Sequence, residues 1–255
     1  MSDPIVVLLH AFPFDARLWA PQAEVLAAAG WQVHAPNLPG FGGTELLLGS
    51  PSIDAVADAV LADLDNRGID RAILGGISLG GYVAMAMLRK RPEIFVAAIC
   101  CDTKASADTQ LARENRLRMA KAVTDSPQEC GRILQQSMLA GLLGVVTRDT
   151  RPEVVEQVAG WLTDADPRTV AWYQQAMADR AESLTALGAL DIPVLVLWGA
   201  EDTLSPEVDQ IAMLQVLRRG QEAKISGAGH LSIVEQPAGT ARAIADFFGA
   251  VRRPG

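Results

Sequence analysis

Short apolar runs alternate with amphipathic segments along the first hundred residues. Apolar runs lie at 5–9, 72–75 and 95–101, and a more mixed stretch at 31–35 has the composition of a further strand. An uninterrupted apolar run is typical of a strand buried on both faces of a parallel sheet. Helical patterns separate these stretches, at 15–29, 51–64 and 82–90. This alternation predicts a mostly parallel sheet with helices on both faces.

The alternation stops after Asp102 and resumes only near residue 187. Four helical patterns without a strand fill the interval, at 109–123, 128–139, 153–162 and 168–178. Beyond it, strands are expected at 193–198 and 222–226 and helices at 206–217 and 237–251. We therefore predict an α/β core made of residues 1–105 and 187–255, with a helical cap, residues 106–186, inserted between two strands.

The pentapeptide Gly76-Ile77-Ser78-Leu79-Gly80 joins a predicted strand to a predicted helix. Small residues two positions before and after the serine permit a tight turn, which exposes the Ser78 Oγ at the carboxyl end of the strand. The N-terminus of the helix favours negative charge beside Ser78. A glycine-rich turn in which Ser78 only caps the helix has the same pattern, so the rest of the chain must decide.

Two more reactive side chains follow predicted strands. Asp202 comes after the 193–198 strand, and His230 comes after the 222–226 strand. Because the carboxyl ends of parallel strands meet at one edge of a sheet, we expect Ser78, Asp202 and His230 to lie together. Their order along the chain, serine then acid then histidine, is that of one lineage of catalytic triads.

Each of these three residue types suits one role in nucleophilic catalysis. A serine hydroxyl needs a base, histidine titrates near neutrality, and a buried carboxylate fixes the histidine tautomer. We therefore predict Ser78 as nucleophile, His230 as base and Asp202 as the acid. Negative charge that develops on the substrate needs two backbone donors. We expect these to be the N–H groups of Phe12 and Leu79.

Four motifs together resemble the α/β-hydrolase superfamily over nearly the whole chain. They are His10-x-x-Pro13, Gly76-x-Ser78-x-Gly80, Gly199-x-x-Asp202 and Gly229-His230. The resemblance implies the α/β-hydrolase fold. There is no room before Ile5 for the two extra strands of many relatives, so we expect six strands. Ala11 is a departure, since relatives usually carry Gly there.

Several roles have alternatives. Asp202 could be a solvated loop acid, with Glu201 or Asp102 as the third member of the triad. Asp102 also follows a strand, and some members of the superfamily resemble that placement. His230 could be a surface histidine after a glycine turn. Of the other two histidines, His10 is expected to organise its loop by hydrogen bonding and His34 to be structural.

The resemblance also narrows the reaction. A serine at position 78 disfavours the epoxide-hydrolase and haloalkane-dehalogenase branches, which use aspartate there. The segments 78–82, 102–105 and 229–237 look like those of 3-oxoadipate enol-lactonases and small carboxylesterases. This implies a serine hydrolase that cleaves a small carboxylic ester or lactone through an acyl-enzyme. Enol-lactonase proper, perhydrolase, carbon–carbon bond hydrolase and a non-catalytic ligand-binding protein are the alternatives.

Candidate pocket residues lie in the predicted cap. Met138, Leu139, Trp161 and Trp172 could line an apolar pocket, although packing inside the cap is the alternative role. An acidic lactone would need a cation. The candidate arginines are Arg113, Arg116, Arg118, Arg132, Arg148 and Arg151.

Composition excludes several other classes of function. A net charge of −8 argues against nucleic-acid and anionic-membrane partners, and no apolar run is long enough to span a bilayer. The N-terminus lacks the basic region of a secretory signal, and the three cysteines have no zinc spacing. We expect reduced thiols in the cytoplasm, no metal or other cofactor, and a small-molecule substrate as the partner. The sequence indicates no oligomeric state.

Overall fold

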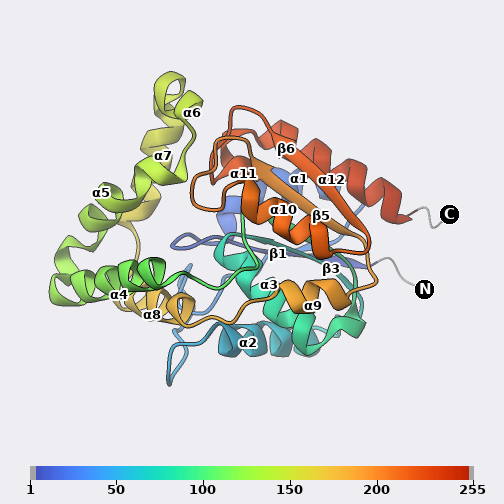
Figure 1. Ribbon diagram of the computed structural model, residues 1–255, viewed down its shortest axis with the longest axis horizontal. Coiled ribbons are helices and arrows are strands. Elements are labelled where there is room, and N and C mark those ends of the chain that lie inside the picture. The colour runs from blue at the N-terminus through green and yellow to red at the C-terminus, as the bar shows by residue number, and fades with distance from the viewer. Residues whose placement is uncertain (1–3, 253–255) are drawn as a thin grey trace.

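The computed structural model describes residues 4–252, and its centre is one six-stranded sheet (Figure 1). The strands lie in the order β2-β1-β3-β4-β5-β6, and every neighbouring pair is parallel. Their bounds are Ile5–Leu9 (β1), Val33–His34 (β2), Ala72–Ile77 (β3), Phe95–Cys101 (β4), Val194–Gly199 (β5) and Gly220–Ile225 (β6). The predicted fold class is confirmed.

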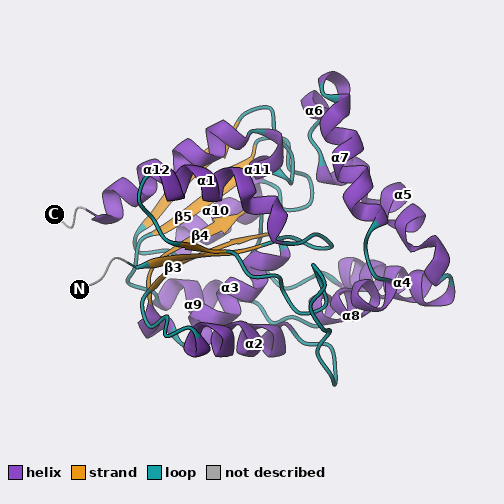
Figure 2. Cartoon of the chain, turned by 180° about the vertical axis from the view of Figure 1, so that it is seen from behind, coloured by secondary structure: helices purple, strands orange, loops and turns teal. Residues whose placement is uncertain are grey.

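Helices cover both faces of the sheet (Figure 2). One face packs against α1 (Ala20–Ala28) and α12 (Pro237–Arg252). The other face packs against α3 (Leu79–Lys90), which in turn contacts α2 (Ile53–Asn66) and α9 (Leu184–Ala189). Helix α10 (Glu207–Val216) lies beside α9 on this second face. The four-residue helix α11 (Ser232–Glu235) begins two residues after His230.

A helical insertion between β4 and β5 lies to one side of the sheet in Figures 1 and 2. Most of it consists of α4 (Gln110–Asp125), α5 (Cys130–Leu142), α6 (Val145–Thr150), α7 (Pro152–Thr163) and α8 (Pro167–Ala178). Helix α4 packs on α8, and α5 packs on α7. Helix α8 also rests on the core, since the Tyr173 hydroxyl donates a hydrogen bond to the Pro39 carbonyl at 2.9 Å.

The two ends of the insertion meet where it joins the core. The Ser183 N–H donates to the Ala105 carbonyl at 2.7 Å, and the Arg180 guanidinium donates to the Ser106 carbonyl at 2.9 Å. We call these four residues the neck. The chain therefore leaves the edge of the sheet and returns to it at adjacent points.

The structure differs from the predicted elements in short segments. Strand β2 spans two residues rather than the predicted 31–35, because only Val33 and His34 pair with β1. The buried Trp31 ring packs on Phe248. Helices α6, α9 and α11 were not predicted. They contain six, six and four residues, which is too few to show a helical period.

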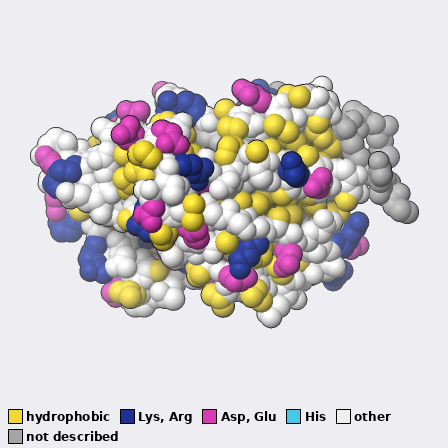
Figure 3. Space-filling model, turned by 90° about the horizontal axis from the view of Figure 1, so that it is seen from above, with side chains coloured by type: hydrophobic (Ala, Val, Ile, Leu, Met, Phe, Trp, Pro, Cys, Tyr) yellow, Lys and Arg dark blue, Asp and Glu magenta, His cyan; other side chains and the backbone are white. Residues whose placement is uncertain are grey.

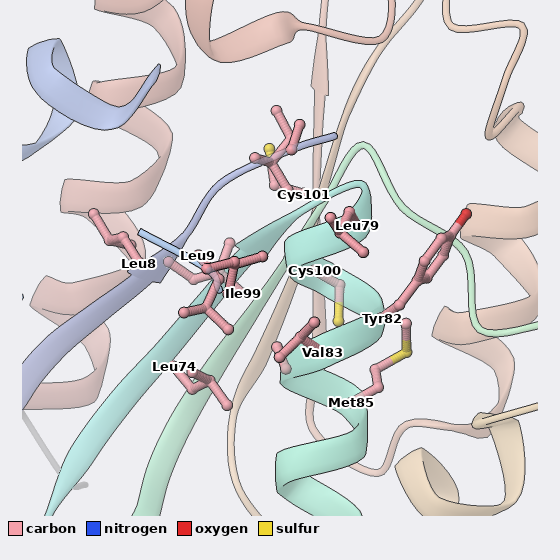
Figure 4. Close-up of a cluster of buried hydrophobic side chains, with 14 of the residues drawn as sticks. Leu8, Leu9, Leu74, Leu79, Tyr82, Val83, Met85, Ile99, Cys100 and Cys101 are labelled. Atoms are coloured by element: carbon pink, nitrogen blue, oxygen red, sulfur yellow. The ribbon is translucent and has the colours of Figure 1, made fainter. Parts of the chain in front are cut away.

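The core beneath the candidate site is packed between three strands and α3 (Figure 4). Leu8, Leu74 and Ile99 come from β1, β3 and β4 and are fully buried. Val83 lies against them from α3, whereas the Tyr82 ring points away from the sheet. Burial of a side chain of this size contributes about 1.5–3 kcal/mol, so the strand ends that carry the site are held on a rigid base.

Candidate active site

Ser78 occupies a strained turn between β3 and α3. Its φ of 51° and ψ of −112° are unusual for a residue other than glycine. Two hydrogen bonds hold this conformation. The Ser78 N–H donates to the Cys101 carbonyl at 3.0 Å, and the Thr103 hydroxyl donates to the Ser78 carbonyl at 2.8 Å. The side chain is thereby directed outward at the carboxyl edge of the sheet.

The two glycines that flank Ser78 are required by close backbone packing. A Cβ on Gly76 would lie 2.2 Å from the Gly80 carbonyl oxygen. A Cβ on Gly80 would lie 2.2 Å from the carbonyl oxygen of Leu9, at the end of β1. Neither contact can exist in a folded chain, so the small residues expected at these positions have a direct steric cause.

Ser78, His230 and Asp202 form one hydrogen-bonded chain. The His230 Nε2 lies 2.8 Å from the Ser78 Oγ, and the His230 Nδ1 lies 2.9 Å from the Asp202 Oδ2. A carboxylate only accepts hydrogen bonds, so the proton of the neutral imidazole belongs on Nδ1 and Nε2 faces the serine as an acceptor. Asp202 is itself oriented by the N–H groups of Leu204 and Ser205 and by the Ser205 hydroxyl.

The electrostatics of the pair favour a charged imidazolium. Burial lowers the pKa of His230, but the charge and hydrogen bond of Asp202 outweigh burial, with weaker contributions from the charges of Asp102 and Glu235, and the net shift is upward. Burial raises the pKa of Asp202, and hydrogen bonds from His230 and Ser205, with the His230 charge, more than reverse this shift. A proton taken up by His230 is therefore stabilised.

The alternative acids lie elsewhere. Asp102 is fully buried, and its Oδ1 accepts from the Gly199 N–H at 2.8 Å. Its Oδ2 accepts from the N–H and the hydroxyl of Ser232 at 3.0 and 2.6 Å. Glu201 accepts from the Val146 N–H at 3.1 Å. Asp202 is thus the carboxylate that contacts the His230 ring, while Asp102 joins the end of β5 to the start of α11.

The two expected backbone donors lie at the ends of their elements. Leu79 is the first residue of α3, and Phe12 lies in the loop after β1. Among the loop and turn hydrogen bonds of residues 4–252, neither N–H has a partner. The loop is fixed by His10, whose Nδ1 contacts the Ala11 carbonyl and whose Nε2 accepts from the Leu38 N–H. Burial lowers the pKa of His10 to about 4, so this ring is neutral.

A cavity of about 360 Å³ opens beside Ser78 and His230. Its apolar wall comes from both the core and the insertion. This wall includes Phe12, Met119, Met138, Leu142 and Leu204. Of the four candidate pocket residues, Met138 lines this cavity.

The other three candidates lie outside it. Trp161 contacts the Phe14 ring and lines a second cavity of about 680 Å³, whose lining does not include Ser78 or His230. Trp172 is buried, and its indole N–H donates to the Gly49 carbonyl at 3.4 Å. Leu139 is partly buried and packs against the apolar core. A helical pattern identifies an apolar face but does not distinguish these environments.

A polar wall of the same cavity carries two cations. Lys104 and Arg116 line it together with Asp108. The Asp108 carboxylate pairs with Arg116 at 2.5 Å and with the buried Arg180 at 2.7 Å. The Arg180 guanidinium lies over the Tyr82 ring, 4.0 Å from its centroid. Within the described chain the Lys104 ammonium makes no hydrogen bond, and Asp108 is 4.0 Å away.

Sequence reasoning missed Lys104 and two further residues of this site. Tyr82 follows Ser78 by one helical turn and lines the cavity. Glu235 is fully buried and accepts from the Gly229 N–H at 2.8 Å. A spacing of four from Ser78 could have identified Tyr82. No local pattern distinguishes Glu235 from a solvated helix residue.

Within residues 4–252, no group of three His, Cys, Asp or Glu side chains has the arrangement of a metal site. None of the described helices is long and apolar enough to cross a membrane. On the face shown in Figure 3, acidic and basic side chains are interspersed.

Comparison with known proteins gives a consistent result. The family model for the alpha/beta hydrolase fold matches residues 4–237. The chain is 27% identical over 256 residues to a pimeloyl-[acyl-carrier protein] methyl ester esterase from Aromatoleum aromaticum, covering 96% of this chain and 98% of that protein. It is 28% identical over 235 residues to 3-oxoadipate enol-lactonase 2 from Acinetobacter baylyi, covering 92% and 84%.

A solved structure is also similar over nearly the full length. The thermophilic esterase from Thermogutta terrifontis, studied with malate bound, superposes with a TM-score of 0.92 at 34% sequence identity. The match covers 99% of this chain and 92% of that one. The chain therefore belongs to the α/β-hydrolase family, among relatives that include esterases and an enol-lactonase.

Proposed function

We propose that the protein is a serine hydrolase that cleaves a small carboxylic ester or lactone through an acyl-enzyme. The observation that carries this proposal is the continuous hydrogen-bonded chain from the Ser78 Oγ through the His230 ring to Asp202. The strained turn at Ser78, the adjoining cavity and the esterase relatives agree with it.

Acylation begins at Ser78. The His230 Nε2 takes the hydroxyl proton while the Ser78 Oγ attacks the carbonyl carbon. The carbonyl oxygen becomes negatively charged and accepts hydrogen bonds from the N–H groups of Phe12 and Leu79, beside the start of α3. His230 then gives its proton to the leaving alcohol oxygen as the carbon–oxygen bond breaks. With a lactone, this oxygen stays tethered to the acyl group.

Deacylation repeats these steps with water. The His230 Nε2 takes a proton from water, and the resulting hydroxide attacks the acyl-enzyme carbonyl. Collapse of the second tetrahedral intermediate releases the carboxylic acid, and the proton on His230 returns to the Ser78 Oγ. Asp202 stays ionised throughout and stabilises the imidazolium.

The helical insertion fits the role of a cap. Met119, Met138 and Leu142 belong to it and line the cavity beside Ser78, so their size would limit the substrate. We further propose that the protein acts in the cytoplasm, because Cys100, Cys101 and Cys130 are buried and unbridged.

The test compares initial rates on a graded series of p-nitrophenyl acyl esters and on the enol-lactone of 3-oxoadipate. Ser78→Ala protein provides the background. We expect Ser78→Ala to remain folded and to lose at least about 10³-fold in turnover. A twofold loss would remove Ser78 from the role of nucleophile. Absence of a phosphonate adduct at Ser78 in the folded wild type would favour a non-catalytic, ligand-binding member of the family.

A second candidate is hydrolysis of a lactone or ester that carries its own carboxylate. The Lys104 ammonium and the Arg116 guanidinium line the cavity, and Asp108 neutralises only part of the charge near them. An anionic substituent would complete this arrangement. The similarity to the enol-lactonase from Acinetobacter baylyi supports this second candidate.

Two matched substrates distinguish the candidates: the p-nitrophenyl half-ester of a dicarboxylic acid and the p-nitrophenyl ester of a monocarboxylic acid of equal length. If the second candidate is correct, Lys104→Met lowers the ratio of their kcat/KM values by about tenfold. The exposed Lys121→Met provides the control. A ratio that Lys104→Met does not change favours neutral esters.

A further inference from the structure

Glu235 is a buried carboxylate outside the proposed triad. Its two oxygens hold two segments that are far apart in the sequence. The Oε1 accepts from the Gly229 N–H at 2.8 Å, and the Oε2 accepts from the Gly144 N–H at 2.8 Å. Gly229 directly precedes His230, whereas Gly144 lies in the helical insertion, immediately before α6. Burying a carboxylate is costly unless such bonds compensate, so both contacts matter energetically.

The two segments touch along their backbones. The Leu231 N–H donates to the Leu142 carbonyl at 3.1 Å, on the other side of His230 from Gly229. A Cβ on Gly229 would lie 2.4 Å from the Gly144 nitrogen, and a Cβ on Gly144 would lie 2.8 Å from the Gly229 nitrogen. Only glycine at both positions permits this approach. His230 is therefore flanked on both sides by contacts to the insertion.

Helix α6 is attached to the core at both ends. At its start, the Val146 N–H donates to the carboxylate of Glu201, the neighbour of Asp202. At its end, the Arg151 guanidinium donates to the Glu235 carbonyl and to the buried Thr147 hydroxyl. One short helix is thus connected to the loop that carries Asp202 and to α11, the helix that follows His230.

The same stretch of the insertion also reaches the cavity. Gly141 and Leu142 line it together with Ser78 and His230. Two residues further along the chain, Gly144 bonds to Glu235. The segment that contacts a bound substrate is therefore continuous with the segment that fixes the base.

Resting on the function proposed above, we propose that Glu235 is a positioning residue that couples the helical insertion to the catalytic base. Its carboxylate joins the insertion at Gly144 to the backbone beside His230, so the insertion helps to hold the imidazole in place as well as to shape the pocket. Displacement of this part of the insertion would misplace the base for every substrate, including the smallest.

The principal test uses p-nitrophenyl acetate, whose acyl group is too small to need the pocket. We expect Glu235→Gln to lower kcat/KM for acetate and for longer esters alike, by about 10- to 100-fold, because the amide nitrogen does not accept a backbone N–H. The exposed Glu153→Gln, in α7, is the matched control and should stay near wild type. An acetate rate within about twofold of wild type would overturn the proposal.

A second readout does not depend on turnover. The carboxylates whose charges act on the His230 ring are Asp202, Asp102 and Glu235. Removing the charge of Glu235 should lower the pH at which the His230 ring titrates, measured by NMR in a chain with only three histidines. An unchanged midpoint would mean that the Glu235 carboxylate does not lie beside the His230 backbone, and it would contradict the proposal.

Gly144→Ala provides a variant with no change of charge. Its Cβ would lie 2.6 Å from the Glu201 carboxylate and should push the two segments apart. We expect a loss on acetate of about tenfold, with the His230 titration close to wild type. This variant decides the question if Glu235→Gln fails to fold, and an unaltered acetate rate would refute the coupling. If wild type is no faster than Ser78→Ala, the hydrolase proposal fails, and the NMR titration still tests the contact.

Discussion

Ser78 and Asp102 are the two residues other than glycine with positive φ in the described chain. They lie just beyond the neighbouring strands β3 and β4, and the Ser78 N–H bonds to the carbonyl of Cys101. Strain at Ser78 exposes the proposed nucleophile, whereas Asp102, which has a similar strain, turns its carboxylate inward. There it ties together the segments that carry Asp202 and His230.

Asp102 should make folding stability depend on pH. Burial, with the charge of Asp202, raises its pKa to about 7, above the value of 3.8 expected in the unfolded chain. Its stabilising contribution is therefore complete below about pH 4 and is lost as pH rises through 7. Asp102→Asn removes this dependence. We expect the free energy of unfolding of Asp102→Asn, relative to wild type, to rise between about pH 4 and pH 7, by up to about 1.4 kcal/mol per pH unit, and to level off above that range, as measured by urea titrations.

The titration of His230, the proposed base, should determine how activity depends on pH. Because the net shift raises the pKa of His230 and the reaction needs the neutral ring, kcat/KM should rise with pH through a midpoint above 6.5. The measurement is a pH–rate profile on a neutral ester. A midpoint well below 6.5 would contradict the electrostatic description of the site.

Individual site residues could be predicted from the sequence where a local motif carries the chemistry. Ser78, Asp202 and His230 follow predicted strands, so topology alone brings them to one edge. The contacts of Asp102, Glu235 and Lys104 depend on loops that meet only in the folded chain. No spacing in the sequence encodes such a meeting.

At the scale of elements, the long apolar strands were predictable because burial on both faces leaves no polar positions. The long helices of the insertion were predictable for a related reason, since each buries one face. Helix α6 was missed because six residues between Gly144 and Arg151 show no period, yet its attachments make it central to the further proposal. Strand β2 was overestimated because the apolar Trp31 fits a strand pattern, although it lies outside the pairing with β1 and packs on α12.

The turn that carries Ser78 should tolerate no added methyl group. Gly80→Ala would place a Cβ 2.2 Å from the carbonyl oxygen of Leu9, so we expect a loss of about 3 kcal/mol or more in stability and a large loss of activity. Gly160→Ala, in helix α7, is the matched control. Its Cβ meets nothing within 4 Å, and it should gain about 0.5–1 kcal/mol. Chemical denaturation of both variants checks the contrast.

At the scale of the whole molecule, the cavity is a joint product of the core and the insertion. Phe12 and Leu204 belong to the core, whereas Met119 and Met138 belong to the insertion. The sequence predicted an insertion but not which of its apolar residues face the cavity, because that depends on how the helices sit on the sheet. Met138 faces it, and Trp172 packs beside Tyr173 instead.

Enlarging Met138 should shorten the accepted acyl chain. We expect Met138→Trp to lower kcat/KM for long-chain p-nitrophenyl esters by about tenfold or more while acetate changes little, because the added volume fills the cavity beyond the smallest acyl group. Leu139→Trp tests the specificity of this effect, since Leu139 does not line the cavity. Equal losses for all chain lengths would place Met138 in a structural role.

The neck has a consequence for how such proteins diversify. Because the chain departs after Ala105 and returns at Ser183, a hydrogen bond apart, a different helical segment could be grafted between these points without altering β4 or β5. The contact at Gly144 restricts this freedom. A transplanted segment that lacks a glycine facing Gly229 would form a new pocket but would leave His230, the proposed base, without its contact to the insertion. A change of substrate specificity that keeps the rate would therefore require both the new segment and this glycine.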